Sequence, residues 1–203
     1  MSDITRREAL GLMAAVPIAH AIELAPPVVD RAIRAAERAQ ADAEATGTAF
    51  TPTFFTAHEW RTVRMLVDYV IPRDERSGSA TDAGVPEFMD FIMRDKPDNQ
   101  TWMRGGLAWM DAQCRDAHGK AWVDCTPAQR TALLDAIAWP KKAKPEMSHG
   151  VAFFNRFRDM TSSGFWSSKL GIEDLRYMGN RMMPGWNGCP DEALKKLGVS
   201  YNE

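Results

Sequence analysis

The chain has 203 residues, of which 45% are hydrophobic and 26% are charged, and its formal net charge is −2. This length and composition are typical of one well-buried globular domain with short appendages. The near-neutral charge argues against a nucleic-acid-binding protein, and no apolar run reaches the roughly 20 residues that a membrane-spanning helix needs.

The first element in the chain, residues 1–21, has the pattern of a twin-arginine export signal. Arg6 and Arg7 precede a short, weakly hydrophobic run, residues 12–19, and the small-residue pattern Ala-His-Ala ends at residue 21. The alternative interpretation is a frayed N-terminal helix of a cytosolic protein. We expect export to the periplasm in the folded state, and leave open whether the segment is then removed.

The next segment, residues 22–53, is expected to form a helical arm and a linker. Residues 28–45 are rich in strong helix formers, and Gly47 ends the run. The apolar stripe of this helix is thin, so the pattern predicts weak packing against the rest of the chain.

Residues 54–163 are expected to form a compact all-α domain of about five helices. Thr56 followed by Glu59, and Thr126 followed by Gln129, are capping boxes that mark two helix starts. Apolar residues recur at helical spacing, and no segment alternates as a strand does. The expected helices cover residues 56–71, 85–93, 100–117, 126–138 and 148–163.

Two features inside this domain invite a functional interpretation. The loop at residues 73–84 contains several carboxylates, but its spacing departs from that of a calcium-binding loop, so a solvated loop is the better prediction. Gly105 and Gly106 interrupt the third helix, where each glycine costs on the order of 1 kcal/mol relative to alanine. We expect the close approach of another backbone there.

The cysteines are odd in number, which is unusual for an exported protein. Cys114 and Cys125 flank a predicted turn between two helices and can form a disulfide, which would stabilise the fold by roughly 2–3 kcal/mol. Three buried free thiols, Cys189 included, are an equally good interpretation. The sequence has no C-x-x-C pair, which argues against an iron–sulfur cluster or a covalently attached haem in this chain.

The last segment, residues 164–203, is expected to be an irregular tail rich in Gly, Pro and Trp. It is too apolar for a disordered tail, so it must pack on this domain, insert into a partner, or do both. Trp and Tyr side chains are typical anchors of protein interfaces, and Trp166 and Trp186 are the candidate anchors here. The predicted partner-binding residues are Phe165, Trp166, Tyr177, Asn180, Pro184 and Trp186.

No catalytic, cofactor-binding or metal-binding residue is predicted in this chain. The four histidines lack a second ligand at metal-binding spacing, and no nucleophile elbow or phosphate-binding loop is present. Acid–base pairs among Asp68, Asp90 and Asp111 stay open as an alternative. Their places on amphipathic helices favour roles that face solvent or a partner.

Taken together, these motifs resemble the gluconate 2-dehydrogenase subunit 3 family, the small or gamma subunits of such enzymes. The Arg6-Arg7 leader, the helix of residues 54–72 and the following loop carry part of the resemblance. The tail is the most specific part. The matching residues there are Gly164, Phe165, Gly171, Ile172, Asp174, Leu175, Tyr177, Gly179, Asn180 and the run from Pro184 to Pro190.

The resemblance implies a partner that does the chemistry. Members of the family accompany a large FAD-dependent flavoprotein of the glucose–methanol–choline (GMC) oxidoreductase type, often with a multihaem cytochrome c. The expected function is that of a non-catalytic subunit needed for assembly, stability and co-export of a flavoprotein that oxidises gluconate, glucose or a glucoside. One alternative is a subunit that shapes the flavoprotein's active-site entrance, through residues 73–84 or the tail. Another is a stand-alone periplasmic enzyme.

Overall fold

The computed structural model describes residues 24–177, 179, 185 and 188–201, and this part of the chain is all-α, as predicted. Eight α-helices and three short 3₁₀ helices, with no β-strand among these residues, make up the fold. The α-helices are α2 (Pro26–Thr46), α3 (Ala57–Val70), α4 (Val85–Asp95), α5 (Gln100–His118), α6 (Pro127–Ala138), α7 (Ser148–Ser167), α8 (Lys169–Asp174) and α9 (Asp191–Leu197). The 3₁₀ helices are η1 (Pro97–Asn99), η2 (Trp122–Asp124) and η3 (Pro145–Met147). The five predicted helices correspond to α3–α7. Within the described ranges, no helix has the length and hydropathy needed to cross a bilayer.

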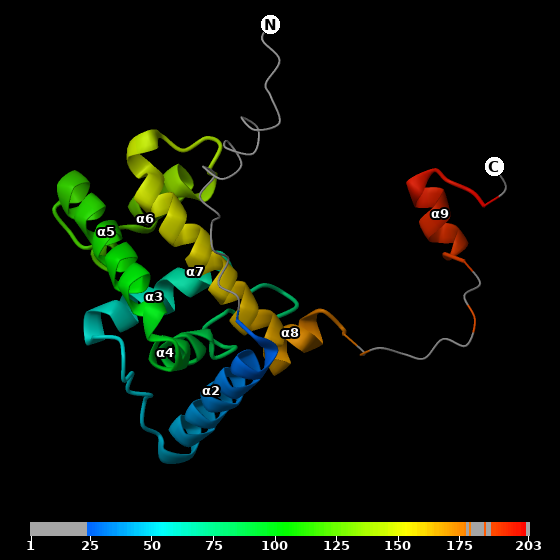
Figure 1. Cartoon of the computed structure of the whole chain (residues 1–203), viewed down its shortest axis with the longest axis horizontal. Coiled ribbons are helices and arrows are strands. Elements are labelled where there is room, and N and C mark those ends of the chain that lie inside the picture. The colour runs from blue at the N-terminus through cyan, green and yellow to red at the C-terminus, as the bar shows by residue number, and fades with distance from the viewer. Residues whose placement is uncertain (1–23, 178, 180–184, 186–187, 202–203) are drawn as a thin grey trace, which may run out of the picture.

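Helix α7 is the centre of the fold (Figure 1). It packs against α2, α3, α4, α5, α6 and α8. Its buried face carries large apolar side chains, each of which contributes about 1.5–3 kcal/mol when fully buried. These residues are Phe153, Phe154, Phe157, Met160 and Phe165. This aromatic face therefore forms the middle of the hydrophobic core.

Both predicted capping boxes are confirmed. The Thr56 hydroxyl accepts the Glu59 backbone N–H at 3.2 Å, and the Glu59 carboxylate accepts the Thr56 N–H at 2.8 Å. Thr126 and Gln129 form the same reciprocal pair at the start of α6. Each box satisfies backbone donors that the first helical turn leaves unpaired, so these two helix starts are set by local sequence.

The expectation that the N-terminal helix packs weakly is wrong. Helix α2 lies along α4 and also contacts α7, and it buries Val28, Ala32, Ile33 and Ala36. Its small alanines let the helix axes approach closely, so a thin apolar stripe is enough to form a packed face. The exposed side of α2 is held to α4 by Arg31, which pairs with Asp95 at 3.3 Å.

The expected start of the irregular tail at residue 164 is also wrong, because α7 continues to Ser167. Gly164 lies inside the helix, where a Cβ would sit 2.9 Å from the ring of Phe88. The close contact between α7 and α4 therefore explains this glycine. A short helix, α8, then continues the ordered body beyond α7 to Asp174.

Helices α5 and α7 approach each other through two glycines. A Cβ on Gly106 of α5 would lie 1.8 Å from the ring of Phe153 on α7, and a Cβ on Gly150 of α7 would lie 2.3 Å from the ring of Trp109 on α5. Each helix thus receives an aromatic ring of the other. The prediction that another backbone approaches these glycines is wrong, because the neighbour of Gly106 is the side-chain ring of Phe153. At the neighbouring Gly105 a Cβ would meet nothing within 4 Å.

Candidate functional site

Four exposed apolar side chains lie at the end of the helical body, on the last turn of α7, on α8 and just after it. Trp166 and Ile172 are each 39% exposed, Leu175 is 55% exposed and Tyr177 is 61% exposed. We call these four residues the α8 surface. Large aromatic and aliphatic side chains that stay in contact with water at one end of a molecule are typical of protein interaction sites.

The predicted partner-binding residues divide into three groups. Trp166 and Tyr177 belong to the α8 surface. Phe165 is only 1% exposed and packs in this chain's own core, so the expectation that it contacts a partner is corrected. It lies on the inner side of α7, whereas the ring of Trp166 stands perpendicular to it with centroids 4.9 Å apart. Asn180, Pro184 and Trp186 lie outside the described residues, as do Arg6 and Arg7 of the predicted export signal.

The loop at residues 73–84 is attached to α8. The guanidinium of Arg76 donates to the backbone carbonyl of Asp174 at 2.7 Å and pairs with its carboxylate at 2.9 Å. The side chain of Leu170 lies 3.0 Å from the position that a Cβ on Gly78 would take. The structure therefore brings together two regions that were predicted as separate segments, namely this loop and the start of the tail.

The carboxylates of the same loop bind donors of the loop itself. Asp74 accepts the backbone N–H groups of Arg76 and Ser77, each at 2.8 Å, and these hydrogen bonds lower the pKa of Asp74. Asp82 accepts the Ser79 N–H at 2.6 Å and pairs with Arg73 at 2.7 Å. These interactions fix the shape of the loop.

Helix α9 is a second exposed element, and four of its seven residues are charged. None of its residues is buried, and it stands apart from the helical body (Figure 1). Leu197, Val199 and Tyr201, at its end and just after it, are exposed. A seven-residue helix is too short to be stable alone in water, so α9 needs a surface to pack against.

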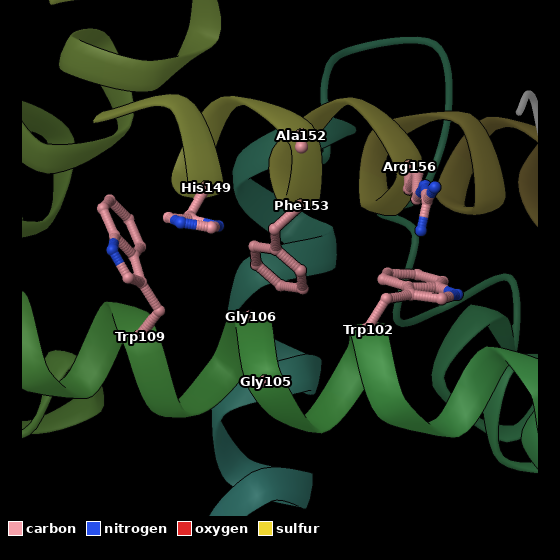
Figure 2. A pocket seen from close by; sticks show the side chains of 8 residues that line it. All are labelled: Trp102, Gly105, Gly106, Trp109, His149, Ala152, Phe153 and Arg156. Atoms are coloured by element: carbon pink, nitrogen blue, oxygen red, sulfur yellow. The ribbon is translucent and has the colours of Figure 1, made fainter. Parts of the chain in front are cut away.

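A groove with a volume of about 410 Å³ runs between α5 and α7 (Figure 2). We call it the α5–α7 groove. Its lining residues are Trp102, Gly105, Gly106 and Trp109 from α5, and His149, Ala152, Phe153 and Arg156 from α7. This groove was not predicted from the sequence. The signal was present in the spacing of seven residues between Trp102 and Trp109, and again between His149 and Arg156, which places each pair on one helix face.

The three carboxylates left open as acid–base candidates do not come together. Asp90 accepts backbone N–H groups of the segment before α3, and Asp68 accepts the N–H of Thr81 at 2.8 Å. Asp111 accepts the N–H of Trp122 at 3.0 Å and lies 2.6 Å from His58. Each carboxylate therefore fixes a different connection between helices, which is a structural role.

One further carboxylate is buried without full pairing. Glu87, in the first turn of α4, lies 3.9 Å from Arg64, and its second oxygen has no hydrogen-bond partner. Burial raises the pKa of Glu87. This oxygen is not among the lining atoms of the α5–α7 groove or of the α8 surface, so Glu87 belongs to neither candidate site.

Cys114 and Cys125 are neighbours and both are buried free thiols. Burial, followed by hydrogen bonding to Cys125, raises the pKa of the Cys114 thiol from 9.0 to about 12. The Cys114 thiol ionises at a lower pH in the unfolded chain than in the folded one. The stability of the fold is therefore unaffected by this group below pH 9, and it falls as the pH rises from 9 through about 12. The disulfide between the two stays a prediction.

We expect Cys114 to react with iodoacetamide far more slowly than Cys189 in the folded, reduced protein at pH 8. The thiolate is the reactive form, and burial disfavours it at Cys114, whereas Cys189 is only half-buried. Peptide mass spectrometry after timed alkylation measures both rates in one sample. Equal rates at the two cysteines would contradict the buried environment of Cys114. A second sample that has never been reduced tests the disulfide: after denaturation without reductant, a bonded pair stays unlabelled.

Among the described residues, no three His, Cys, Asp or Glu side chains are grouped so that they could hold a metal ion. No curated protein and no solved structure matches the chain. The family model for gluconate 2-dehydrogenase subunit 3 matches residues 57–185, which extends from the start of α3 through the α8 surface. A match over more than half of the sequence, together with the all-α body that positions this surface, shows that the chain belongs to the gluconate 2-dehydrogenase subunit 3 family.

Proposed function

We propose that this chain is the non-catalytic small subunit of a periplasmic, FAD-dependent sugar dehydrogenase, and that it assembles with the flavoprotein subunit and accompanies it through twin-arginine export. Membership in the family supports an accessory subunit of a dehydrogenase complex. The observation that carries the proposal is the α8 surface, a group of exposed apolar side chains within the family match.

The α8 surface has the properties of an interface anchor. Trp and Tyr dominate the binding energy of many interfaces, and truncating such an anchor costs about 2 kcal/mol or more. Trp166 rests on the buried ring of Phe165, so it is held in place before a partner arrives. An anchor that is already ordered loses little conformational entropy on binding.

The export part of the proposal follows from the chemistry of the expected partner. A flavoprotein of the GMC type acquires FAD as it folds, so it must cross the membrane folded. The pair Arg6 and Arg7 provides the pattern of the pathway that carries folded proteins. A flavoprotein without its own signal would then be exported together with this chain. A cytochrome c subunit would accept the electrons in such a complex.

We expect Trp166→Ala to weaken the complex with the co-expressed flavoprotein subunit by roughly 30-fold, because about 2 kcal/mol of anchor energy is lost. Trp139→Ala is the matched control, since Trp139 is also an exposed tryptophan, in the turn after α6. Co-purification followed by titration of the separated subunits measures both variants. Melting curves of the lone chain verify that each variant is folded.

Two results would count against the proposal, at different levels. If the wild-type chain and the flavoprotein elute separately under mild conditions, the proposed function fails. If the complex forms but Trp166→Ala and Trp139→Ala bind like the wild type, the function stands and the α8 surface is the wrong interface.

A second candidate function is favoured by the position of the loop at residues 73–84. Because Arg76 attaches this loop to α8, a partner that covers the α8 surface would also meet the loop. The subunit would then shape the entrance to the flavoprotein's active site. Turnover of the isolated flavoprotein, compared with that of the complex, separates the two functions. Unchanged kinetics together with lost export support assembly alone.

A further inference from the structure

The α5–α7 groove contains a glycine that the fold itself does not need. Gly105 lies in the middle of α5, where glycine costs about 0.5–1 kcal/mol relative to alanine. A Cβ at this position would meet nothing within 4 Å. The adjacent Gly106 is different, because the ring of Phe153 fills the space that its side chain would take. The open space above Gly105 is therefore available to a group from outside this chain.

At each end of the groove, a tryptophan of α5 lies opposite a basic side chain of α7. Trp102 and Trp109 stand two turns apart on α5, and His149 and Arg156 stand two turns apart on α7 (Figure 2). Seven helical residues span about 10.5 Å. The guanidinium of Arg156 lies 6.0 Å from the ring centre of Trp102. At the other end, His149 faces Trp109.

The centre of the groove is lined by small residues, so the space lies between these two ends. Gly105 of α5 and Ala152 of α7 both line it, and between the two helices the ring of Phe153 lies against Gly106 (Figure 2). Gly105, Ala152 and His149 are exposed, and the two tryptophans are half-exposed. The groove is thus open along its length, unlike the enclosed pockets that bury most of a small ligand.

The charge of the groove has one sign. Arg156 is its one permanently charged lining residue, and no acidic residue lines it. His149 lies in the first turn of α7, a 20-residue helix whose N-terminus has no side-chain cap. The Ser148 N–H is already paired with the Pro145 carbonyl of η3, so the positive potential beside His149 comes from the N-terminal end of the α7 helix dipole. Both ends of the groove therefore favour negatively charged groups.

We propose that the α5–α7 groove binds an extended acidic segment of the dehydrogenase partner, with two carboxylates three residues apart and an apolar side chain between them. In a polyproline II segment, residues three apart point to the same side and lie about 9.3 Å apart. This matches the distance of about 10 Å between the Arg156 and His149 positions on α7. The apolar side chain lies over Gly105 between the two indole rings. A small anion would use one end only, whereas such a segment uses both. This inference rests on the proposed function.

The test uses the full chain and a synthetic capped peptide with the core sequence Glu-Leu-Pro-Glu. The indole N–H signals of Trp102 and Trp109, assigned with Trp→Phe variants, report binding by NMR. We expect both signals to shift in a saturable way, and the same peptide with Lys in place of Glu to leave them unchanged. Absence of a shift with the acidic peptide would overturn the proposal, as would equal shifts with the Lys peptide or with succinate alone.

Two matched pairs of variants place the binding in the groove. Gly105→Leu fills the centre, whereas Ala108→Leu adds the same side chain at an exposed position of α5 that does not line the groove. Arg156→Glu reverses the charge at one end, whereas Arg158→Glu makes the same change at an exposed arginine outside it. We expect at least a tenfold loss of peptide affinity for the first member of each pair and less than about a twofold change for the second. Equal effects within a pair would contradict the site.

The same variants separate this inference from the proposed function. If the flavoprotein subunit co-purifies equally with wild type, Gly105→Leu and Arg156→Glu, the function stands and the groove is not its docking site. If the wild-type chain does not bind the flavoprotein, the proposed function fails, and the peptide experiment still decides whether the groove takes an acidic segment.

Discussion

Replacement of Asp90 by alanine is expected to destabilise the fold by about 3–5 kcal/mol. Asp90 is 1% exposed, and its carboxylate accepts the backbone N–H groups of Thr53, Phe54 and Phe55 at 3.1, 2.9 and 3.2 Å. Hydrogen bonds to a charged acceptor contribute roughly 1.5–3 kcal/mol each, and buried donors left without a partner add their desolvation cost. These contributions are not additive, so the expected total is below their sum.

The reason for this large effect is the position of Asp90 in the fold. It lies on α4 and fixes the segment that precedes the capping box of α3, and this segment places Phe54 and Phe55 in the core. The backbone carbonyl of Phe54 in turn accepts from Arg104 of α5 at 2.9 Å. The Asp90 carboxylate therefore helps to fix how α3, α4 and α5 pack together.

Urea denaturation followed by circular dichroism measures this effect, with two controls. Asp90→Asn keeps an acceptor oxygen without the charge and should lie between wild type and alanine. Asp95→Ala on the same helix removes a partly exposed ion pair with Arg31 and should cost less than about 1 kcal/mol. A loss below about 1 kcal/mol for Asp90→Ala would show that the segment before α3 is held by its aromatic rings instead.

The sequence was enough to predict those parts of the fold that depend on local signals. The starts of α3 and α6 follow from their capping boxes, because the donor and the acceptor lie three residues apart in the chain. The five expected helices follow from apolar spacing. Such signals are contained within one or two helical turns, so they can be recognised without knowing which helices are neighbours.

The packing of α2 and the end of α7 depend on residues far away in the sequence. Ala32 and Ala36 stabilise the fold because α2 packs against α4. Gly164 is tolerated in a helix because Phe88 lies against it. No local pattern contains this information. For the same reason the sequence pattern predicted that Phe165 contacts a partner, although the structure places it in the core.

The candidate sites also depend on pairs of distant elements. The attachment of Arg76 to Asp174 makes one surface of the loop and α8, although 98 residues separate them in the chain. The α5–α7 groove likewise needs Trp102 and Arg156 on two helices. The sequence predicted that the tail region would matter, while the structure identifies which of its described side chains are available to a partner.

Adjacent glycines of α5 are expected to respond to the same substitution with opposite signs. A Cβ on Gly106 would lie 1.8 Å from Phe153, whose ring is also packed against Trp102 and Phe157 with centroid distances of 6.1 and 5.6 Å. The ring cannot move without disturbing both neighbours. Forcing extra volume into a packed core costs about 1–3 kcal/mol, and a clash this close should give a net loss of about 2 kcal/mol or more.

Gly105→Ala should instead stabilise the protein by about 0.5–1 kcal/mol, because alanine is the better helix former and a Cβ there meets nothing within 4 Å. Urea denaturation of the two variants beside wild type measures both signs. If Gly105→Ala destabilises the lone chain, the space above Gly105 is not open and the α5–α7 groove loses the feature that suggested an external occupant. If Gly106→Ala is neutral, the contact between α5 and α7 is looser than the close approach of Phe153 implies.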